Sequence, residues 1–430
     1  MSELQAERAE AEQLSPPRRA DPVTWIRTFL REPTVLLLAS QVLTGVVALA
    51  ANILMVRSLT PTHRGEVALL LQVVYLSTQL LLLGTERSFV AAYHNVAPAA
   101  AVRAYARLLA VPCGLFLTAG LIWSIAAPQR LTPGAALTAM VCWFALIEAT
   151  ALATRSIAIA VGRTRDFLVS RVMEALLLLA MLIGLYLAGA GNPAAWLAAY
   201  LIAGALPTVT FLVFWMRLLP AAGATPVRPE QNRLVRREGL ALFPAAISNM
   251  AMLRVDRLVI PALASTAALG LYASVATMTE LLAWPLRAYA DSRLGRWRAA
   301  HLDGTLRIKP ILTAVTAYTL VAVPIAAAGL YLLIEPVFGH QYHPAQVIVV
   351  PLVVAAGLYG ISRVVLGLLI AKGHAKLVST AEITGFVVSF AGYLLLIPAL
   401  GILGAAWGSL LGYGSCLIFA LVTTALVRDR

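Results

Sequence analysis

Charged residues are scarce in this chain of 430 residues, at 12% of the total, and only 20 are acidic, against 33 Lys and Arg. A soluble domain contains about 25% charged residues, so most of this chain cannot face water. Hydrophobic residues make up 60% of it, and the mean hydropathy is +0.84. The shortage of charge therefore excludes a soluble globular protein and predicts an integral membrane protein.

Motifs of catalysis and of metal binding are also missing. The sequence has no Walker-type phosphate loop, no HExxH, no GxSxG and no Cys/His cluster with metal-ligand spacing. Its 3 cysteines fall within apolar runs, which favours core residues over a disulfide framework. No connection between the apolar runs is long enough to fold as a catalytic domain. We therefore expect a protein that is not an enzyme and that has no cofactor and no metal site.

Long apolar runs dominate what is present. A membrane-spanning helix needs about 20 mainly apolar residues, and twelve runs meet this requirement. The pattern predicts an all-α polytopic membrane protein. The expected spans are 34–56, 66–86, 106–127, 134–160, 166–189, 195–217, 239–263, 267–288, 309–334, 345–371, 377–398 and 401–426.

Basic residues are concentrated in the N-terminal tail and in every second connection. The remaining connections carry only Arg57, Arg64 and Arg130. The positive-inside rule therefore places both termini in the cytoplasm. Because the basic residues occur in short segments between apolar runs, the net charge of +13 reflects membrane orientation, and we expect no nucleic-acid partner.

The two halves of the chain resemble each other. Asn52 near the end of the first span matches Asp256 in the seventh, and Gly65 and Gly270 each open the following helix. Six spans per half is an even number, so the halves should form two six-helix lobes related by a pseudo-two-fold axis along the membrane normal. The expected organisation is a cytoplasmic tail with an interfacial segment (1–33), an N-lobe (34–217), a cytoplasmic linker (218–238), a C-lobe (239–427) and a cytoplasmic end (428–430).

Ionisable residues within the spans are the candidate functional residues, because each costs about 2.5–3.5 kcal/mol to insert. Glu148 and Arg155 are two helical turns apart on one face. That face either lines a water-filled cavity or bonds to neighbouring helices.

The segment NMAMLRVDRLVI (249–260) contains two features at helical spacing. Arg254 and Arg257 share a face, and two guanidinium forks suit a phosphate or pyrophosphate; the alternative is that each pairs with an acid such as Glu280. Asp256 is nearly aligned with Asn249, which suits bonding between helices. The predicted substrate-pathway residues are Arg254, Arg257, Arg155, Glu148, Glu280 and Arg363, and the predicted structural polar residues are Asn249, Asp256 and Asn52.

Several segments carry a family resemblance: VRSLTPTHRGEVALL after the first span, VDRLVI followed by LGLYASVATMTEL, the loops AVGRTR and AKGHAK, and the closing LGILGAAWGSLLGYG. With these, the chain resembles the multidrug/oligosaccharidyl-lipid/polysaccharide (MOP) exporter superfamily. It is most similar to the polysaccharide-transporter branch, which includes flippases of O-antigen and capsule repeat units.

The resemblance implies two six-helix lobes around a cationic cavity in the cytoplasmic membrane of a bacterium. Its cargo would be an undecaprenyl-pyrophosphate-linked oligosaccharide, moved by alternating access, with membrane lipids around it and with a polysaccharide polymerase and glycosyltransferases as partners. Two alternatives remain open. One is an exporter of another amphiphilic solute or drug in the same fold, and the other is a non-transporting membrane component of polysaccharide assembly.

Overall fold

Helices make up nearly all of the computed structural model, which describes residues 33–426 except 94–95, 127–134 and 218–228. Within those residues, 10 helices are long and apolar enough to cross a membrane. Two further predicted spans correspond to α3, whose described apolar part is the shorter helix Val42–Ser58, and to the consecutive pair α10–α11. The chain is thus an all-α multi-pass membrane protein, as the apolar runs predicted. Most of the predicted tail, residues 1–32, and the predicted end, 428–430, lie outside the described residues.

The first half of the bundle begins with a helical hairpin that is closed by a capped turn. The side chain of Thr60 accepts a hydrogen bond from the backbone N–H of His63, and Pro61 occupies the first helical position. This cap starts α4 five residues before the predicted span and places Arg64 inside the helix. The helices are α3 (Pro33–Ser58), α4 (Pro61–Leu82), the short α5 (Thr85–Ala92), α6 (Pro98–Ala126), α7 (Ala135–Ala160), α8 (Thr164–Leu187) and α9 (Pro193–Arg217).

The second half repeats this capped turn. Ser265 caps α12 by accepting a hydrogen bond from the backbone N–H of Ala268, as Thr60 does for α4. The elements are α10 (Pro229–Arg254), α11 (Asp256–Leu263), α12 (Thr266–Leu302), α13 (Ile308–Leu333), a π-helical turn η1 (Ile334–Phe338), a 3₁₀ segment η2 (His340–Ile348), α14 (Val349–Ala371), α15 (Ala375–Leu400) and α16 (Ile402–Leu426).

The predicted seventh span is divided in two at Val255. The carboxylate of Asp256 accepts the backbone N–H of Arg257, so that N–H is drawn away from the regular helical pattern. Pro261 weakens α11 further, since it has no N–H to donate to the preceding turn. Arg254 therefore ends α10, and Arg257 lies in the first turn of α11.

Part of the predicted linker is helical. α10 begins at Pro229, and its first turns pack against α5 of the first half, where Ser88 Oγ donates to the carbonyl of Val235 at 3.1 Å. Gly84 and Gly239 bring the two backbones together at this contact. Residues 229–238 of the predicted linker over 218–238 are thus helical, and tertiary packing rather than hydropathy stabilises their helix.

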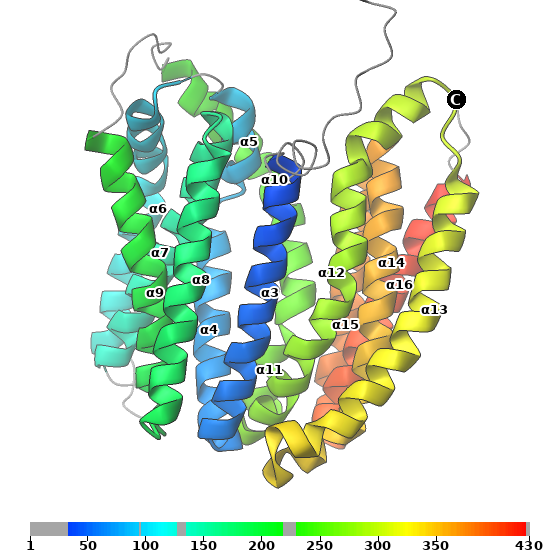
Figure 1. Cartoon of the computed structure of the whole chain (residues 1–430). Coiled ribbons are helices and arrows are strands. Elements are labelled where there is room, and N and C mark those ends of the chain that lie inside the picture. The colour runs from blue at the N-terminus through cyan, green and yellow to red at the C-terminus, as the bar shows by residue number, and fades with distance from the viewer. Residues whose placement is uncertain (1–32, 94–95, 127–134, 218–228, 427–430) are drawn as a thin grey trace, which may run out of the picture.

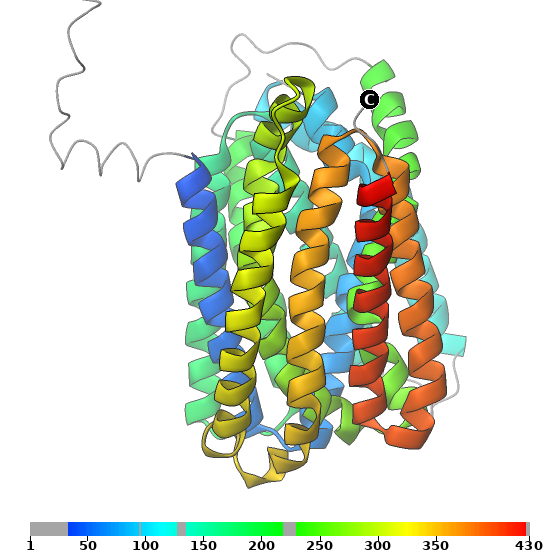
Figure 2. The same cartoon turned by 90° about the vertical axis from the view of Figure 1, so that its right-hand side faces the viewer.

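Two lobes with separate hydrophobic cores form the bundle. One core is built mainly from α3–α9, and the others come mainly from α11–α16. In Figure 1 the lobes converge where α3 turns into α4 and α11 into α12, which we call the hairpin end. They spread apart at the opposite, termini end, where α3 begins and α16 ends. Figure 2 views the second lobe from outside and shows α14, α15 and α16 side by side.

Backbone contact between glycines closes the hairpin end. A Cβ added at Gly65 of α4 would overlap the carbonyl oxygen of Thr266, and one added at Gly270 of α12 would overlap that of Pro61. Each added Cβ would also stand 3.0 Å from the backbone nitrogen of the other glycine. The two glycines that match in the sequence repeat thus face each other across the boundary between the lobes.

Polar contacts reinforce this closure. Arg57 at the end of α3 donates to the carbonyls of Pro336 and Val337 in η1. Tyr342 of η2 donates to the carbonyl of Leu59 at 3.2 Å. The α3–α4 turn is therefore tied to the second lobe at the side of the glycine contact as well as through it.

Candidate functional site

A cavity of about 300 Å³ lies between the lobes, and we call it the central cavity. Helices α3, α4, α7, α8 and α9 line it from the first lobe, and α10, α11 and α12 line it from the second. Its volume is at the lower end of the range of about 300–1,000 Å³ that is typical of small-molecule sites. Tyr75, Tyr200 and Trp284 supply aromatic surface. The charged lining residues are Arg64, Glu148, Arg171, Glu174, Arg254, Arg257 and Glu280.

Arg64 is a buried cation at the closed end of this cavity, next to the glycine contact. Only 3% of the residue is exposed. Its Nη2 donates to Asn52 Oδ1 at 2.9 Å, and Asn52 Nδ2 donates to the carbonyl of Ser274 in the other lobe at 2.9 Å. Nε and Nη1 of Arg64 have no hydrogen-bond partner, and no carboxylate within the described part of the chain pairs with it.

An uncompensated buried charge costs several kcal/mol. Proteins keep ionisable groups within a membrane where they bind something. Sequence reasoning missed Arg64, because it placed the residue in the connection after the first span. The Thr60–Pro61 cap signal starts a helix before Arg64, and it could have placed this side chain one turn inside α4.

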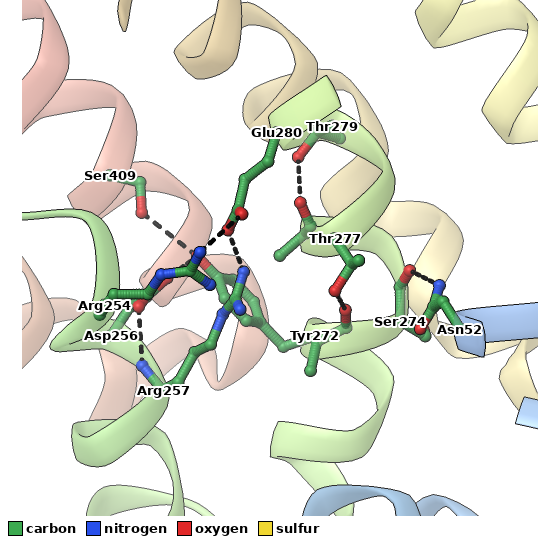
Figure 3. A network of polar contacts seen from close by, with 12 residues as sticks. Asn52, Arg254, Asp256, Arg257, Tyr272, Ser274, Thr277, Thr279, Glu280 and Ser409 are labelled. Atoms are coloured by element: carbon green, nitrogen blue, oxygen red, sulfur yellow. Dashed lines mark hydrogen bonds and ion pairs between the residues drawn. The ribbon is translucent and has the colours of Figure 1, made fainter. Parts of the chain in front are cut away.

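Arg254 and Arg257 meet in the cavity wall at a single carboxylate, that of Glu280 on α12 (Figure 3). Arg254 Nη2 lies 3.2 Å from Glu280 Oε2, and Arg257 Nη2 bonds to Glu280 Oε1. Arg254 also lies over the ring of Tyr75, 5.8 Å from its centroid. The structure therefore shows the pairing of each arginine with Glu280, which was one of the two alternatives, and it also places both arginines in the cavity wall.

Asp256 points away from the central cavity. Its Oδ2 accepts a hydrogen bond from Tyr272 at 2.7 Å, and the Tyr272 hydroxyl is 3.2 Å from Ser409 Oγ (Figure 3). These contacts join α11, α12 and α16 beside a smaller cavity of about 80 Å³ within the second lobe. Asn249 instead accepts from Arg363 Nη1 at 3.1 Å. Asp256 and Asn249 therefore bond to different helices, since the break at Val255 interrupts the helix on which their alignment depended.

We expect Asp256→Ala to lower the thermal midpoint of unfolding by several degrees. The substitution leaves the buried hydroxyl of Tyr272 without its acceptor and removes the carboxylate that faces Arg257, and losing a buried charged partner costs about 3–5 kcal/mol. Asp256→Asn keeps an acceptor and should lose less. A thermal melt of the detergent-purified variants tests this, and equal stability of Asp256→Ala and the wild type would contradict it.

Glu148 lies in the opposite wall of the central cavity, near the ion pair in which Arg171 Nη1 is 2.7 Å from Glu174 Oε2. Glu148 has no hydrogen bond or ion pair to any other described side chain. Gly204 of α9 lies beside it, since a Cβ added at that glycine would stand 3.9 Å from Glu148 Oε1, an ordinary contact distance. Glu148 is thus a carboxylate that faces the cavity without a cation bonded to it.

Two other predicted pathway residues do not line the central cavity. Arg155 is exposed on α7, one residue after the buried Thr154. Arg363 on α14 is inside the second lobe, where Nη1 lies 2.8 Å from Glu382 Oε1. The structure therefore brings together Arg254, Arg257, Glu280 and Glu148, adds Arg64, and leaves Arg155 and Arg363 apart.

Comparisons with known proteins rest on structure alone, since no protein-family model and no curated protein matches the sequence. The chain is similar to the lipid II flippase MurJ in an inward closed conformation, with a TM-score of 0.69 and 10% identity over 91% of this chain and 87% of that one. It is also similar to a multidrug resistance MATE family transporter of the MOP superfamily in an inward-facing conformation, with a TM-score of 0.63 and 15% identity over 89% and 94% of the two chains. The fold is that of the MOP superfamily.

The MOP fold confirms the predicted architecture of about twelve transmembrane helices in two lobes. A MATE family transporter of the MOP superfamily in its outward-facing conformation is also similar, with a TM-score of 0.54 and 15% identity over 91% of this chain and 94% of that one. The score is lower than for the inward-facing structure of a MATE family transporter. The roles of the individual cavity residues remain predictions.

Proposed function

We propose that this chain is a flippase of the bacterial cytoplasmic membrane. Its cargo is an undecaprenyl-pyrophosphate-linked oligosaccharide, which it moves from the inner to the outer leaflet by alternating access, with both termini in the cytoplasm. Glycosyltransferases supply such a cargo, and a polysaccharide polymerase consumes it.

The observation that carries this proposal is Arg64, a buried guanidinium with free donors at the closed end of a cavity that both lobes line. These donors are enclosed in this state. A phosphate group matches them chemically, since a guanidinium can donate to it from several N–H groups at once. Four arginines and three glutamates line the cavity, which leaves one excess positive charge (4 − 3 = 1). An anionic head group is the cargo that this balance favours.

The arrangement of the lobes supports the direction of transport. Exposed basic residues lie at the termini end, among them Arg103, Arg236 and Arg296, and basic ends of membrane helices face the cytoplasm. The glycine contact closes the opposite end. In this proposal the open termini end faces the cytoplasm, and the state with a closed hairpin end accepts cargo from that side.

A second candidate function is export of a cationic amphiphile in the same fold. The observation that favours it is Glu148, which faces the cavity with aromatic Tyr75 and Tyr200 nearby. A carboxylate and aromatic rings are the groups that recognise an organic cation. Replacement of Glu148 by Gln should abolish transport of such a cation and should have a smaller effect on an anionic lipid.

The experiment that tests the proposal uses the purified chain in proteoliposomes with a prenyl-diphosphate-linked saccharide that carries a fluorescent label. A membrane-impermeant quencher added outside bleaches only the outer-leaflet label. With the wild-type chain we expect the protected inner fraction to decay, and with Arg64→Gln we expect it to persist. The matched control is Arg293→Gln, which removes an exposed arginine near the termini end of α12 and should leave transport unchanged.

Two results would overturn the proposal. One is translocation of a labelled organic cation with no movement of the diphosphate-linked saccharide, which would favour the second candidate. The other is movement of neither molecule by a chain that is correctly folded, which would favour a non-transporting role.

A further inference from the structure

A single carboxylate connects two guanidinium groups in the wall of the central cavity. The two oxygens of Glu280 are divided between Arg254 and Arg257, one oxygen to each (Figure 3). The side chains of Arg254 and Glu280 are 23% and 29% exposed, while that of Arg257 is 5% exposed. A molecule in the cavity can therefore reach the outer edge of this cluster.

This bridge is the arrangement that a phosphate group adopts between two arginines. A carboxylate and a phosphate both present oxygens at a spacing that fits a guanidinium fork. Each guanidinium has five N–H donors. A diphosphate offers more acceptor oxygens than the two of Glu280, so it can satisfy the N–H groups that Glu280 now bonds and bond others on the cavity side.

The charge balance on the cavity side of the cluster favours replacement of Glu280 by an entering anion. Two arginines face one glutamate there, and Asp256, which adds a compensating charge, lies outside the central-cavity wall. If Glu280 left, the buried guanidinium of Arg257 and the partly exposed one of Arg254 would both lose their bonded carboxylate in the cavity, which is unfavourable. An entering anion removes that cost, so Glu280 and the anion compete for the same donors.

We propose that Glu280 is an internal stand-in for the diphosphate of the cargo. It occupies the two-arginine site in the empty carrier, and the entering diphosphate displaces it. This proposal rests on the proposed function in taking the cargo to be an anionic lipid. The exchange also acts on the backbone, because Arg254 and Arg257 lie on opposite sides of the break at Val255 and Glu280 holds both sides to α12. Displacement of Glu280 frees that break to bend, whereas its return helps to release the cargo.

The test is a calorimetric titration of the full chain in nanodiscs with inorganic pyrophosphate as the probe. We expect Glu280→Gln to bind pyrophosphate about tenfold or more tightly than the wild type, because the internal competitor is gone. The thermal midpoint of Glu280→Gln without pyrophosphate should fall below that of the wild type, and saturating pyrophosphate should restore it. Glu280→Asp keeps the charge but is one methylene shorter, so its affinity for pyrophosphate should lie between those of the wild type and Glu280→Gln. This variant replaces Glu280→Gln in the titration if Glu280→Gln fails to fold.

The matched control is Glu174→Gln. It removes another paired carboxylate from the cavity wall and changes the net charge by the same amount, but its partner is Arg171. The proposal is supported if the affinity for pyrophosphate rises only in the Glu280 variants and if Arg254→Gln abolishes that rise in the Glu280→Gln background. An equal gain in Glu174→Gln, or no gain in Glu280→Gln, overturns it.

This titration is independent of the transport assay. If Glu280→Gln gains affinity and the wild type moves no diphosphate-linked saccharide, the internal stand-in is supported and the proposed function fails. If the saccharide is moved and Glu280→Gln gains nothing, the stand-in fails and the proposed function remains.

Discussion

Replacing Gly270 with alanine is expected to hold the hairpin end open and to lower transport at least about fivefold. The added methyl group would overlap the carbonyl oxygen of Pro61, which belongs to the other lobe and lies in the backbone of a capped turn. Forcing an extra methyl group into a packed contact costs about 1–3 kcal/mol. Applied to a two-state equilibrium, that cost shifts the equilibrium constant for closure by about fivefold to 150-fold.

A cysteine at Thr277, in the wall of the central cavity, measures the shift. We expect an impermeant thiol reagent applied at the hairpin end to label this cysteine faster when Gly270→Ala is present. Gly295→Ala is the control, since Gly295 lies on the same helix and a Cβ there meets nothing within 4 Å. Equal labelling in the two backgrounds would show that the glycine contact does not close the cavity.

Gly65→Ala should reproduce the effect, because the contact is reciprocal: its added methyl group would overlap the carbonyl oxygen of Thr266. The double variant should be less than additive, since either methyl group alone already separates the same pair of backbones.

Replacing Arg64 with methionine is expected to abolish transport while the thermal midpoint stays the same or rises. Arg64 is a buried cation with two unpartnered nitrogens, and exchange of such a group for an apolar one of similar length is commonly neutral or stabilising. The loss of the charge-assisted bond to Asn52 offsets part of the gain, by about 1.5–3 kcal/mol. Transport and stability should therefore change in different directions.

Arg363→Met is the contrasting variant. Its guanidinium is paired with Glu382, and their side chains are 13% and 9% exposed, so the substitution leaves a buried carboxylate without its partner. We expect that variant to lose about 3–5 kcal/mol of stability, seen as a lower thermal midpoint and lower abundance in the membrane. If Arg64→Met lost stability to the same extent, with transport reduced only in proportion to abundance, Arg64 would be a structural residue.

The outline of the fold could be predicted from the sequence because it depends on local properties. Runs of apolar residues predicted the crossings, and the matching glycines of the two halves proved to be in contact. The sequence was less informative where a local cap or a tertiary contact set a boundary. Thr60 starts α4 before Arg64, and packing on α5 keeps residues 229–238 of the predicted linker helical.

The candidate site was predictable only in part. Spacing placed Arg254 and Arg257 on one face and named Glu280 as an alternative partner, and the structure shows that pair of arginines bridged by that glutamate. Spacing also grouped Arg155 with Glu148, and Arg155 is exposed and absent from the cavity lining, so its place in the pathway stays a prediction. Helical geometry relates residues within one helix, and it contains no information on the side of that helix that a neighbouring helix covers.

By itself, the sequence determined that the chain is a membrane protein, that it has about twelve spans and which glycines match between the halves. These features follow from hydropathy and residue size, each of which can be read from a few neighbouring residues. Only the tertiary structure decided which buried charges are paired. Each residue turns a helix by about 100°, and the break at Val255 alters that register, so the packing of α10, α11 and α12 determines that Glu280 meets both arginines while Arg64 meets no carboxylate within the described chain.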